Sequence, residues 1–349
     1  MSKIQNTLTT ALLMTLCLVG VTTGFAQSAE SCLSAAASVR NSPRDKRVLE
    51  EARALGFSAI RSGRFEDALI VFSAIAETNP VDQMALYFQA LSLFNLKRTE
   101  ESEAAARLAI GAAENMLKAG PDDRQLKNVV ADSLTLHAVI LAVLKKNQEA
   151  LIELMEAVRL SPDNFDAQFS LGRAYFGQGD TAAATEAFKK ASSLRPQDVR
   201  AKFFLATALE RGGNIDGATV AYRNLVILAP ASAEGHLGLG ALLVKRPETL
   251  IEGVAELQRA IDLNGDSYEG RVSLGRALIL AGKPGDAIVH LKMAATLMPA
   301  NPEPHYQMAM AFKKLGRNPE AAEELKTVQR LNEEHRKRSK TAASTVDKP

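Results

Sequence analysis

The chain has 349 residues, of which 46% are hydrophobic and 23% are charged, so its composition is that of a folded protein and not of a disordered polymer. Its 42 basic and 40 acidic residues leave a net charge of +2, which gives no general basic field for nucleic acid. Aromatic residues are scarce, tryptophan is absent and cysteine occurs only twice, which excludes a disulfide-stapled module and favours Ala/Leu-rich helices over a β-sandwich.

Residues 1–26 have the pattern of a secretory signal peptide. Lys3 is their only charge, residues 8–21 are mostly apolar, and Gly24-Phe25-Ala26 places small residues at −3 and −1 of a cut before Gln27. The apolar stretch is shorter than the roughly 20 residues that a membrane-spanning helix needs. The pattern predicts cleavage and a periplasmic or secreted protein, with no integral membrane span after cleavage. An uncleaved N-terminus that tethers the chain to the inner membrane is the alternative.

We expect residues 27–42 to form a flexible N-terminal segment. Cleavage removes Cys17 and leaves Cys32 as the lone cysteine of the mature chain. We expect Cys32 to be a free thiol in this mobile segment, and pairing between two chains is the alternative.

A period of 34 residues organises most of the remaining sequence. Pro162, Pro196 and Pro230 are each 34 residues apart, and Gly265 and Pro299 continue the series with spacings of 35 and 34. Self-similarity at such a period predicts a repeat architecture.

One repeat, residues 165–198, carries a recognisable motif: Leu171-Gly172, Tyr175, Ala184, Phe188, Ala191 and Pro196. This motif resembles the tetratricopeptide repeat (TPR) family, whose unit is a helix–turn–helix of about 34 residues. The resemblance implies an all-α fold, a right-handed TPR superhelix (α-solenoid) of about eight repeats over residues 43–335. In this register the repeats are 49–82, 83–116, 131–164, 165–198, 199–232, 233–267, 268–301 and 302–335.

Two positions of the repeat always hold small residues. Position 8 is Gly or Ala, and position 20 is Ala, Ser or Gly, whereas position 24 is mostly large. We expect the two helices of each repeat to cross closely where the small residues meet, with position 24 filling the space beside them. The aromatic residue that the family has at position 4 is missing, and Gln168, His236 and Arg271 stand there in three of the repeats.

Capping residues agree with this register. The expected N-caps of first helices are Asp82, Asn164, Asp198, Ser232, Ser267 and Asn301. Glycines that end first helices are expected in the following turns, at Gly63, Gly179, Gly213, Gly282 and Gly316. In the first repeat, Ser42-Pro43 predicts a helix that starts near Pro43.

Fourteen residues, 117–130, separate the second and third repeats. Split evenly, they add about two helical turns to each flanking helix, which keeps the same faces inward. The sequence therefore predicts an overlong helical hairpin near residues 105–145, with its turn and the next N-cap within 118–123. A disordered insert is the alternative.

No catalytic or metal-binding motif is found. The five histidines are not within four residues of one another, none has a ligand partner at metal-site spacing, and no nucleophile elbow or phosphate-binding loop is present. The sequence therefore predicts a protein that is not an enzyme, with no catalytic, cofactor-binding or metal residues and no cofactor. His137, at core position 7, is expected to be a hydrogen-bonded interior residue.

The resemblance further implies that first helices line a concave groove, mainly through positions 2, 5, 9, 12 and 13. Apolar, aromatic and arginine side chains there form the predicted partner-binding groove: Tyr87, Leu91, Phe94, Phe169, Arg173, Phe176, Arg200, Phe203, Arg276 and Tyr306. Such a surface suits a protein segment with hydrophobic anchors and some acid. The alternative is that these side chains pack against neighbouring first helices and are mostly buried.

Residues 336–349 are expected to form a basic and polar tail. Basic residues after His335 complement the dipole of the last helix, and a weak contact with an anionic envelope surface is a second role for them.

Taken together, the sequence predicts a non-catalytic protein–protein interaction scaffold or adaptor in the cell envelope, which binds a segment of a protein partner, and not nucleic acid, in its groove. The alternative is an accessory subunit for the assembly or export of an envelope polymer, such as polysaccharide or cell wall.

Overall fold

The structure is a computed structural model that describes residues 24–346. All but the last three residues of the predicted signal peptide, residues 1–26, lie outside the described residues.

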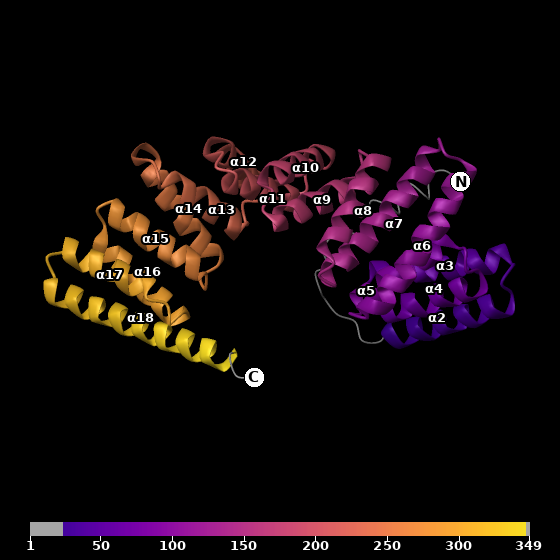
Figure 1. The fold of residues 1–349 in the computed structure, drawn as a ribbon, viewed down its shortest axis with the longest axis horizontal. Coiled ribbons are helices and arrows are strands. Elements are labelled where there is room, and N and C mark those ends of the chain that lie inside the picture. The colour runs from indigo at the N-terminus through magenta and orange to yellow at the C-terminus, as the bar shows by residue number, and fades with distance from the viewer. Residues whose placement is uncertain (1–23, 347–349) are drawn as a thin grey trace. The chain divides into compact units, whose positions relative to one another are not determined.

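The described chain is built from helices, with no strand among residues 24–346 (Figure 1). The helices are α2 (Gly24–Asn41), α3 (Lys46–Arg61), α4 (Phe65–Thr78), α5 (Gln83–Asn95), α6 (Thr99–Ala119), α7 (Arg124–Val143), α8 (Asn147–Leu160), α9 (Phe165–Gln178), α10 (Thr181–Leu194), α11 (Val199–Arg211), α12 (Ile215–Leu228), α13 (Ala233–Leu243), the short 3-10 helix η1 (Pro247–Thr249), α14 (Leu250–Leu263), α15 (Tyr268–Leu280), α16 (Pro284–Leu297), α17 (Glu303–Lys314) and α18 (Asn318–Val346). The predicted all-α fold is confirmed, and each repeat of the register holds one pair of helices, from α3/α4 to α17/α18.

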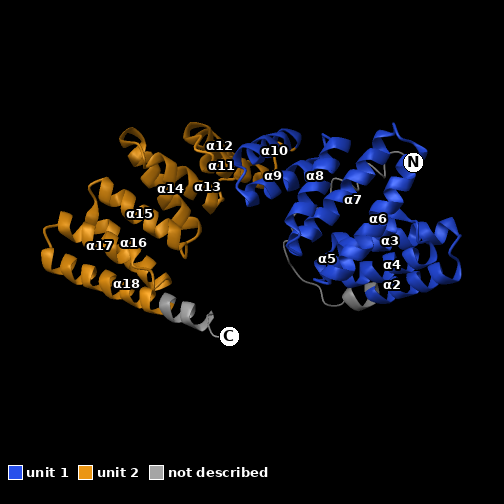
Figure 2. Ribbon diagram, in the orientation of Figure 1, with its two compact units in different colours: residues 1–194 blue, residues 195–349 orange. Residues whose placement is uncertain are grey.

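The chain divides into two compact units, residues 1–194 and 195–349 (Figure 2). Helices α2 to α10 belong to unit 1, and α11 to α18 belong to unit 2. Within each unit every helix pair of a repeat packs together, and the second helix of one repeat also packs on the first helix of the next.

Small residues meet at the crossing of each helix pair, as the sequence predicts. A β-carbon added to Gly172 at position 8 would lie 2.7 Å from the ring of Phe188 at position 24. The same addition at Gly275 would lie 2.6 Å from Leu291, again at positions 8 and 24. Since real β-carbons do not approach other atoms so closely, the large residue at position 24 fills the space that the small residue at position 8 leaves.

The small residue at position 20, on the second helix, faces position 8 at the same helix crossing. In the second repeat, the Ser102 hydroxyl donates a 2.7 Å hydrogen bond to the Ala90 carbonyl, which links position 20 directly to the backbone at position 8. Both residues are fully buried, so a larger side chain at either position would separate the helix axes.

At position 4, where the family has an aromatic residue, polar side chains form hydrogen bonds to the preceding repeat. Gln168 Nε2 donates to the Pro162 carbonyl at 2.9 Å, and Arg271 Nε donates to the Gly265 carbonyl at 2.6 Å. His236 Nε2 lies 3.1 Å from the Pro230 carbonyl, which can only accept. Each acceptor is six residues upstream, at position 32 of the preceding repeat or, in the 35-residue repeat 233–267, at position 33, so a directional bond holds the repeats together there.

Most predicted N-caps are confirmed. Asp82, Asn164, Asp198, Ser232 and Ser267 each accept a hydrogen bond from a first-turn N–H group. The start predicted near Pro43 is wrong, because α3 begins at Lys46 and Asp45 accepts from the N–H groups of Arg47 and Val48. Asn301 is also displaced by one residue, since α17 begins at Glu303 and Asn301 Oδ1 accepts from its N–H group.

The turns after first helices share one backbone conformation. Position 15 takes a positive φ of 69° to 84° at Gly63, Gly179, Gly213, Gly282 and Gly316, which confirms the predicted glycine turns. The second and third repeats have Lys97 and Lys145 at this position, with φ of 64° and 63°. A residue with a β-carbon is less stable than glycine in this region, so these two lysines strain the turn.

Replacing Lys97 or Lys145 with glycine is expected to stabilise unit 1, by about 1 kcal/mol at each site, because the left-handed conformation is more favourable for glycine. The midpoint of urea unfolding, followed by circular dichroism, measures this change. The reciprocal variant Gly179→Lys should lower the midpoint by a similar amount. Midpoints that do not respond to any of the three changes would show that these turns carry no strain.

Residues 27–42 are not the flexible segment that the sequence predicts, because α2 is an ordered helix that packs on α3 and α4. Cys32, Ala36 and Val39 lie on one face at helical spacing and are buried, and Arg40 Nε donates to Glu77 Oε2 at 2.9 Å. Burial raises the pKa of the Cys32 thiol, which therefore belongs to the core of unit 1.

The overlong hairpin is confirmed. Helix α6 has 21 residues and α7 has 20, and Asp123 caps α7 through bonds to the N–H groups of Gln125 and Leu126. The added turns pack against each other through apolar residues, including Leu117 and Ile110 of α6 and Val129 and Val130 of α7. The 14 inserted residues therefore lengthen two ordered helices and do not form a disordered loop.

Helix α7 is also long and apolar enough to cross a membrane by length and composition, and it is the single such helix among the described ones. It packs between α6 and α8, and Ser133, Thr135 and His137 are buried along it. These contacts are those of a core helix in a folded domain.

The predicted tail at 336–349 is helical over most of its length, because α18 continues without a break to Val346. The 29-residue helix is strongly polar, and its buried Leu331 stands at position 30, where the second helices of other repeats end. Alternating charges and the absence of Pro and Gly after Pro319 in this stretch favour continued helix over a loop.

Candidate functional site

The first helices α5, α7 and α9 of unit 1 form one continuous layer. Helix α7 contacts both α5 and α9, and side chains link the beginnings of the three repeats. Gln83 Nε2 donates to Ser133 Oγ at 3.0 Å, and Asn164 Nδ2 donates to Asp132 Oδ1 at 2.7 Å. These bonds fix the register of α5, α7 and α9, so equivalent positions of their repeats lie side by side.

Several predicted groove residues of unit 1 are used for packing. Leu91 and Phe94 of α5 lie against Leu136 and Ile140 of α7 in one apolar cluster. Phe169 is only 6% exposed, with ring centroids of Phe165 and Phe188 each 5.8 Å away. Phe169 is therefore a core residue and is not available as an anchor for a partner.

Tyr87 lies half-buried near the acidic side of this layer. Burial raises the pKa of its hydroxyl well above the usual range, and the carboxylates of Asp132 and Asp166 raise it further. The hydroxyl is therefore neutral at any physiological pH. Tyr87 marks the acidic end of the layer, where the first helices begin.

The opposite end of the layer is exposed. Val143 is 55% exposed, Ala142 and Arg173 are also exposed, and Phe176 is half-buried with its ring centroid 6.4 Å from that of Phe188. We call the exposed and half-buried residues at this end the unit 1 face: Leu91, Phe94, Val139, Ala142, Val143, Arg173 and Phe176.

Unit 2 presents a comparable surface on α15 and α17, which contact each other. Val272 and Ile279 are buried, whereas Leu280 is 61% exposed and Tyr306 is 46% exposed. We call the exposed residues of these two helices the unit 2 face: Arg276, Leu280, Tyr306, Met310 and Lys313.

The two remaining predicted residues lie on α11 and take part in local contacts. Arg200 donates to Asp198 Oδ2 at 3.0 Å beside the N-cap, and this contact lowers the pKa of the Asp198 carboxyl against the opposing effect of its burial. Phe203 is half-buried, with its ring centroid 6.4 Å from that of Tyr222. Burial raises the pKa of Tyr222 to about 12, so its hydroxyl stays protonated and donates to Glu210 Oε2 at 3.1 Å.

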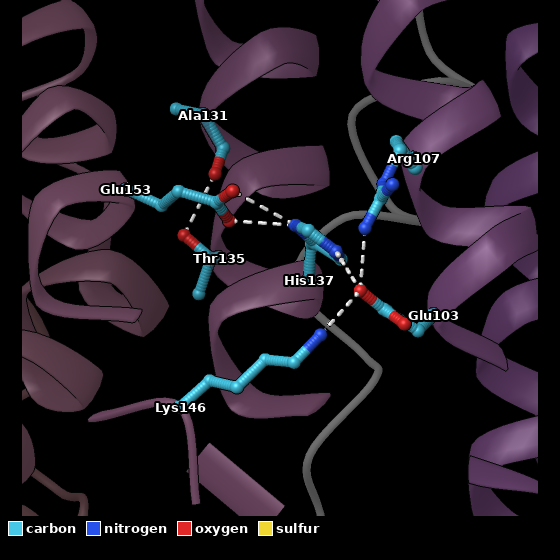
Figure 3. A network of polar contacts seen from close by, with 7 residues as sticks. All are labelled: Glu103, Arg107, Ala131, Thr135, His137, Lys146 and Glu153. Carbon is cyan, nitrogen blue, oxygen red and sulfur yellow. Dashed lines mark hydrogen bonds and ion pairs between the residues drawn. The ribbon is translucent and has the colours of Figure 1, made fainter. Parts of the chain in front are cut away.

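A buried polar network lies where the overlong hairpin meets the third repeat (Figure 3). His137 is 4% exposed, and its Nδ1 lies 2.8 Å from Glu153 Oε2 of α8. Its Nε2 lies 4.0 Å from Glu103 Oε1 of α6, which Lys146 and Arg107 contact at 3.1 and 2.6 Å. The hydrogen bond from Lys146 lowers the pKa of Glu103, so this carboxylate stays ionised among its cations.

This network matches the interior histidine that the sequence predicts at position 7. It joins three helices, α6, α7 and α8, through His137, and the Glu103 carboxylate lies beside the cations of Lys146 and Arg107. Among residues 24–346, no group of three or more His, Cys, Asp or Glu is arranged to hold a metal ion. We therefore assign the network to packing of the hairpin.

Sequence reasoning missed four residues of the exposed surfaces. Val143 and Leu280 are both at position 13, which the register already assigns to the groove, and each is an apolar residue. Lys97 and Lys145 occupy the left-handed turn position where five other repeats have glycine. In both cases the sequence carried a signal, because these single repeats depart from the residue pattern of the other repeats.

Comparisons with known proteins agree with the repeat register. Family models described as tetratricopeptide repeat match residues 53–123, 135–198, 169–233 and 278–342, more than half of the chain. No curated protein sequence matches the chain. The comparisons indicate no enzyme family.

Solved structures with similarity to the chain include MamA, at 24% identity with a TM-score of 0.46, covering 48% of this chain and 97% of that one. MamA from Desulfovibrio magneticus RS-1 is 23% identical to the chain with a TM-score of 0.45. The match covers 49% of this chain and 96% of that one. YrrB, described as a TPR protein with an unusual peptide-binding site, is 16% identical, with a TM-score of 0.47, 55% of this chain and 95% of that one covered.

Proposed function

Because the chain belongs to the tetratricopeptide repeat family, whose domains bind protein partners, we propose that it is a non-catalytic scaffold in the cell envelope that binds a segment of a partner protein on its first-helix faces. A solenoid uses its extended surface for binding, and the specific residues on that surface decide what is bound.

The observation that carries this proposal is the exposure of large side chains on the unit 2 face. Leu280, Tyr306 and Met310 are exposed, although α15 buries Val272 and Ile279 and α17 buries Met308 and Phe312 as their core. The fold does not need these exposed residues, and Arg276 beside them adds a donor that suits a polar or acidic segment. Aromatic, methionine and arginine side chains are also the types enriched where proteins bind each other.

The location in the envelope rests on the signal-like pattern of residues 1–26. N-terminal sequencing of the protein from a periplasmic fraction should give Gln27 as the first residue. A chain that begins at Met1 and stays in the membrane fraction would support the uncleaved tether in its place.

The double variant Tyr306→Ser/Met310→Ser is expected to weaken binding of the protein partner about tenfold or more, because interface aromatic and methionine anchors commonly contribute more than 1 kcal/mol each. A photo-crosslinking residue at Arg276 should capture the partner from the envelope fraction, and the variant should lose this product while circular dichroism stays unchanged. The matched control places the crosslinker at Val289, an exposed apolar residue on the second helix α16. Equal capture from both positions, or none from Arg276, would contradict binding on the unit 2 face.

A further inference from the structure

The turn after the first helix is unusual in two repeats of unit 1. Lys97 and Lys145 have φ of 64° and 63°, in a conformation that the other repeats with this turn satisfy with glycine. The N–H groups of both lysines donate to the residue three positions earlier, Phe94 and Ala142, at 3.1 Å in each case. The two turns therefore have the same geometry as the glycine turns, and lysine is retained there despite its less favourable backbone conformation.

Neither lysine is needed to neutralise a charge within unit 1. The described structure gives the side chains of Lys97 and Lys145 no ion pair and no hydrogen bond, and both are exposed. The residues that directly follow them do form ion pairs: Arg98 with Glu101 at 2.6 Å and Lys146 with Glu103 at 3.1 Å. Arg98 and Lys146 thus have acidic partners, whereas the described structure places no acidic side chain in an ion pair with Lys97 or Lys145.

The two lysines lie at the same edge of the unit 1 face. They follow the ends of α5 and α7, which contact each other in matching register, and the clustering of Leu91 and Phe94 with Leu136, Ile140 and Leu144 places these two helix ends together. Exposed Ala142 and Val143 lie three and two residues before Lys145, and half-buried Phe94 lies three residues before Lys97. Exposed Arg173 on α9 adds a third cation to the same layer.

We propose that the unit 1 face selects a protein segment that carries Asp or Glu next to its apolar anchors, and that Lys97 and Lys145 pair with those acids. The apolar side chains of the segment lie on Phe94, Ala142 and Val143, and its carboxylates lie over the two ammonium groups at the edge. The inference rests on the proposed function and names the chemistry of the partner. An alternative role, in which lysine only complements the dipole of a helix end, predicts no preference in the ligand.

A display library of random 16-residue peptides tests the proposal, with the full chain as bait. Peptides selected by the wild type should combine apolar residues with an excess of Asp and Glu over the unselected library. For the best acidic peptide, the double variant Lys97→Gly/Lys145→Gly should weaken binding about fivefold to tenfold at low salt, since each exposed ion pair contributes modestly. The same peptide with Asn and Gln in place of its acids should bind the wild type and the variant equally.

The glycine variant is suited to this test because its turns are expected to be more stable, so loss of binding cannot come from unfolding. The matched control, Lys46→Gln/Lys189→Gln, removes two exposed charges elsewhere in unit 1 and should leave affinity unchanged. Selection of peptides without excess acid, or an acid preference that survives in the glycine variant, overturns the inference while leaving the proposed function intact. Failure to select any peptide, together with no crosslinking from Arg276, overturns both.

Discussion

Replacing Phe188 with alanine is expected to lower the free energy of unfolding of unit 1 by about 3–5 kcal/mol, the usual cost of emptying a buried phenylalanine site. The ring is fully buried, lies against Gly172 and has the rings of Phe169 and Phe176 beside it. The neighbouring helices are held by their own crossings and cannot close the space. Urea unfolding followed by circular dichroism measures the loss.

A second substitution tests whether the contact between positions 8 and 24 is the cause. Gly172→Ala alone should cost about 2 kcal/mol, because its β-carbon would lie 2.7 Å from the Phe188 ring. In the Phe188→Ala background the same change should be neutral or stabilising, since the methyl group then enters the vacated space. Additive costs in the double variant would show that the two positions do not meet.

Gly240→Val is expected to destabilise unit 2 by about 3 kcal/mol, because backbone atoms of the facing helix, and not only the Leu257 side chain, obstruct the added atoms. An added β-carbon would lie 2.9 Å from the Leu257 nitrogen and 3.0 Å from the Gly253 oxygen, both on α14. Helices α13 and α14 must therefore move apart, and faster hydrogen exchange in both helices measures the change.

Gly177→Val is the matched control for this substitution. Gly177 is also a helical glycine, but an added β-carbon there meets nothing within 4 Å. The control should change stability by less than about 0.5 kcal/mol, as is usual at the surface. Similar losses at Gly177 and Gly240 would mean that helix propensity, and not the helix crossing, explains the effect.

The helix pairs were predictable because the same physical demand recurs in every repeat. A close crossing requires a small residue at fixed intervals, so Gly172 and Gly275 are informative even without any knowledge of their neighbours. The overlong hairpin was predictable for a related reason, since an insertion of whole helical turns preserves the apolar face that Val129 and Val130 continue.

The two ends of the array were not predictable in this way, because each occurs once. Helix α2 has no counterpart in the register, and its buried stripe of Cys32, Ala36 and Val39 is too small and too rich in alanine to stand out from a linker. The end of α18 is rich in charged and polar residues, so its composition suggests a tail and not a continued helix.

The candidate faces were predicted in position but not in detail. The register correctly places Arg173, Arg276 and Tyr306 on first helices, where they are exposed. It does not distinguish them from Phe169, because the same position of the repeat also contacts the adjacent helices, and the depth of a side chain depends on how closely those helices approach. Lys97 and Lys145 could have been recognised from the register, because they stand at the turn position where five other repeats have glycine, and the structure adds that they keep the same positive φ.

The hydrogen bonds from position 4 to the preceding repeat limit how such a chain can change its length during evolution. Gln168, His236 and Arg271 each need a carbonyl six residues upstream, and every preceding repeat supplies one at the same place. Duplication or loss of one complete period, wherever its boundaries fall, keeps each donor matched with an acceptor. A deletion that removes one of these carbonyls but keeps its donor leaves a polar group without its partner inside the protein, so changes of length at these three junctions are expected to occur in whole periods.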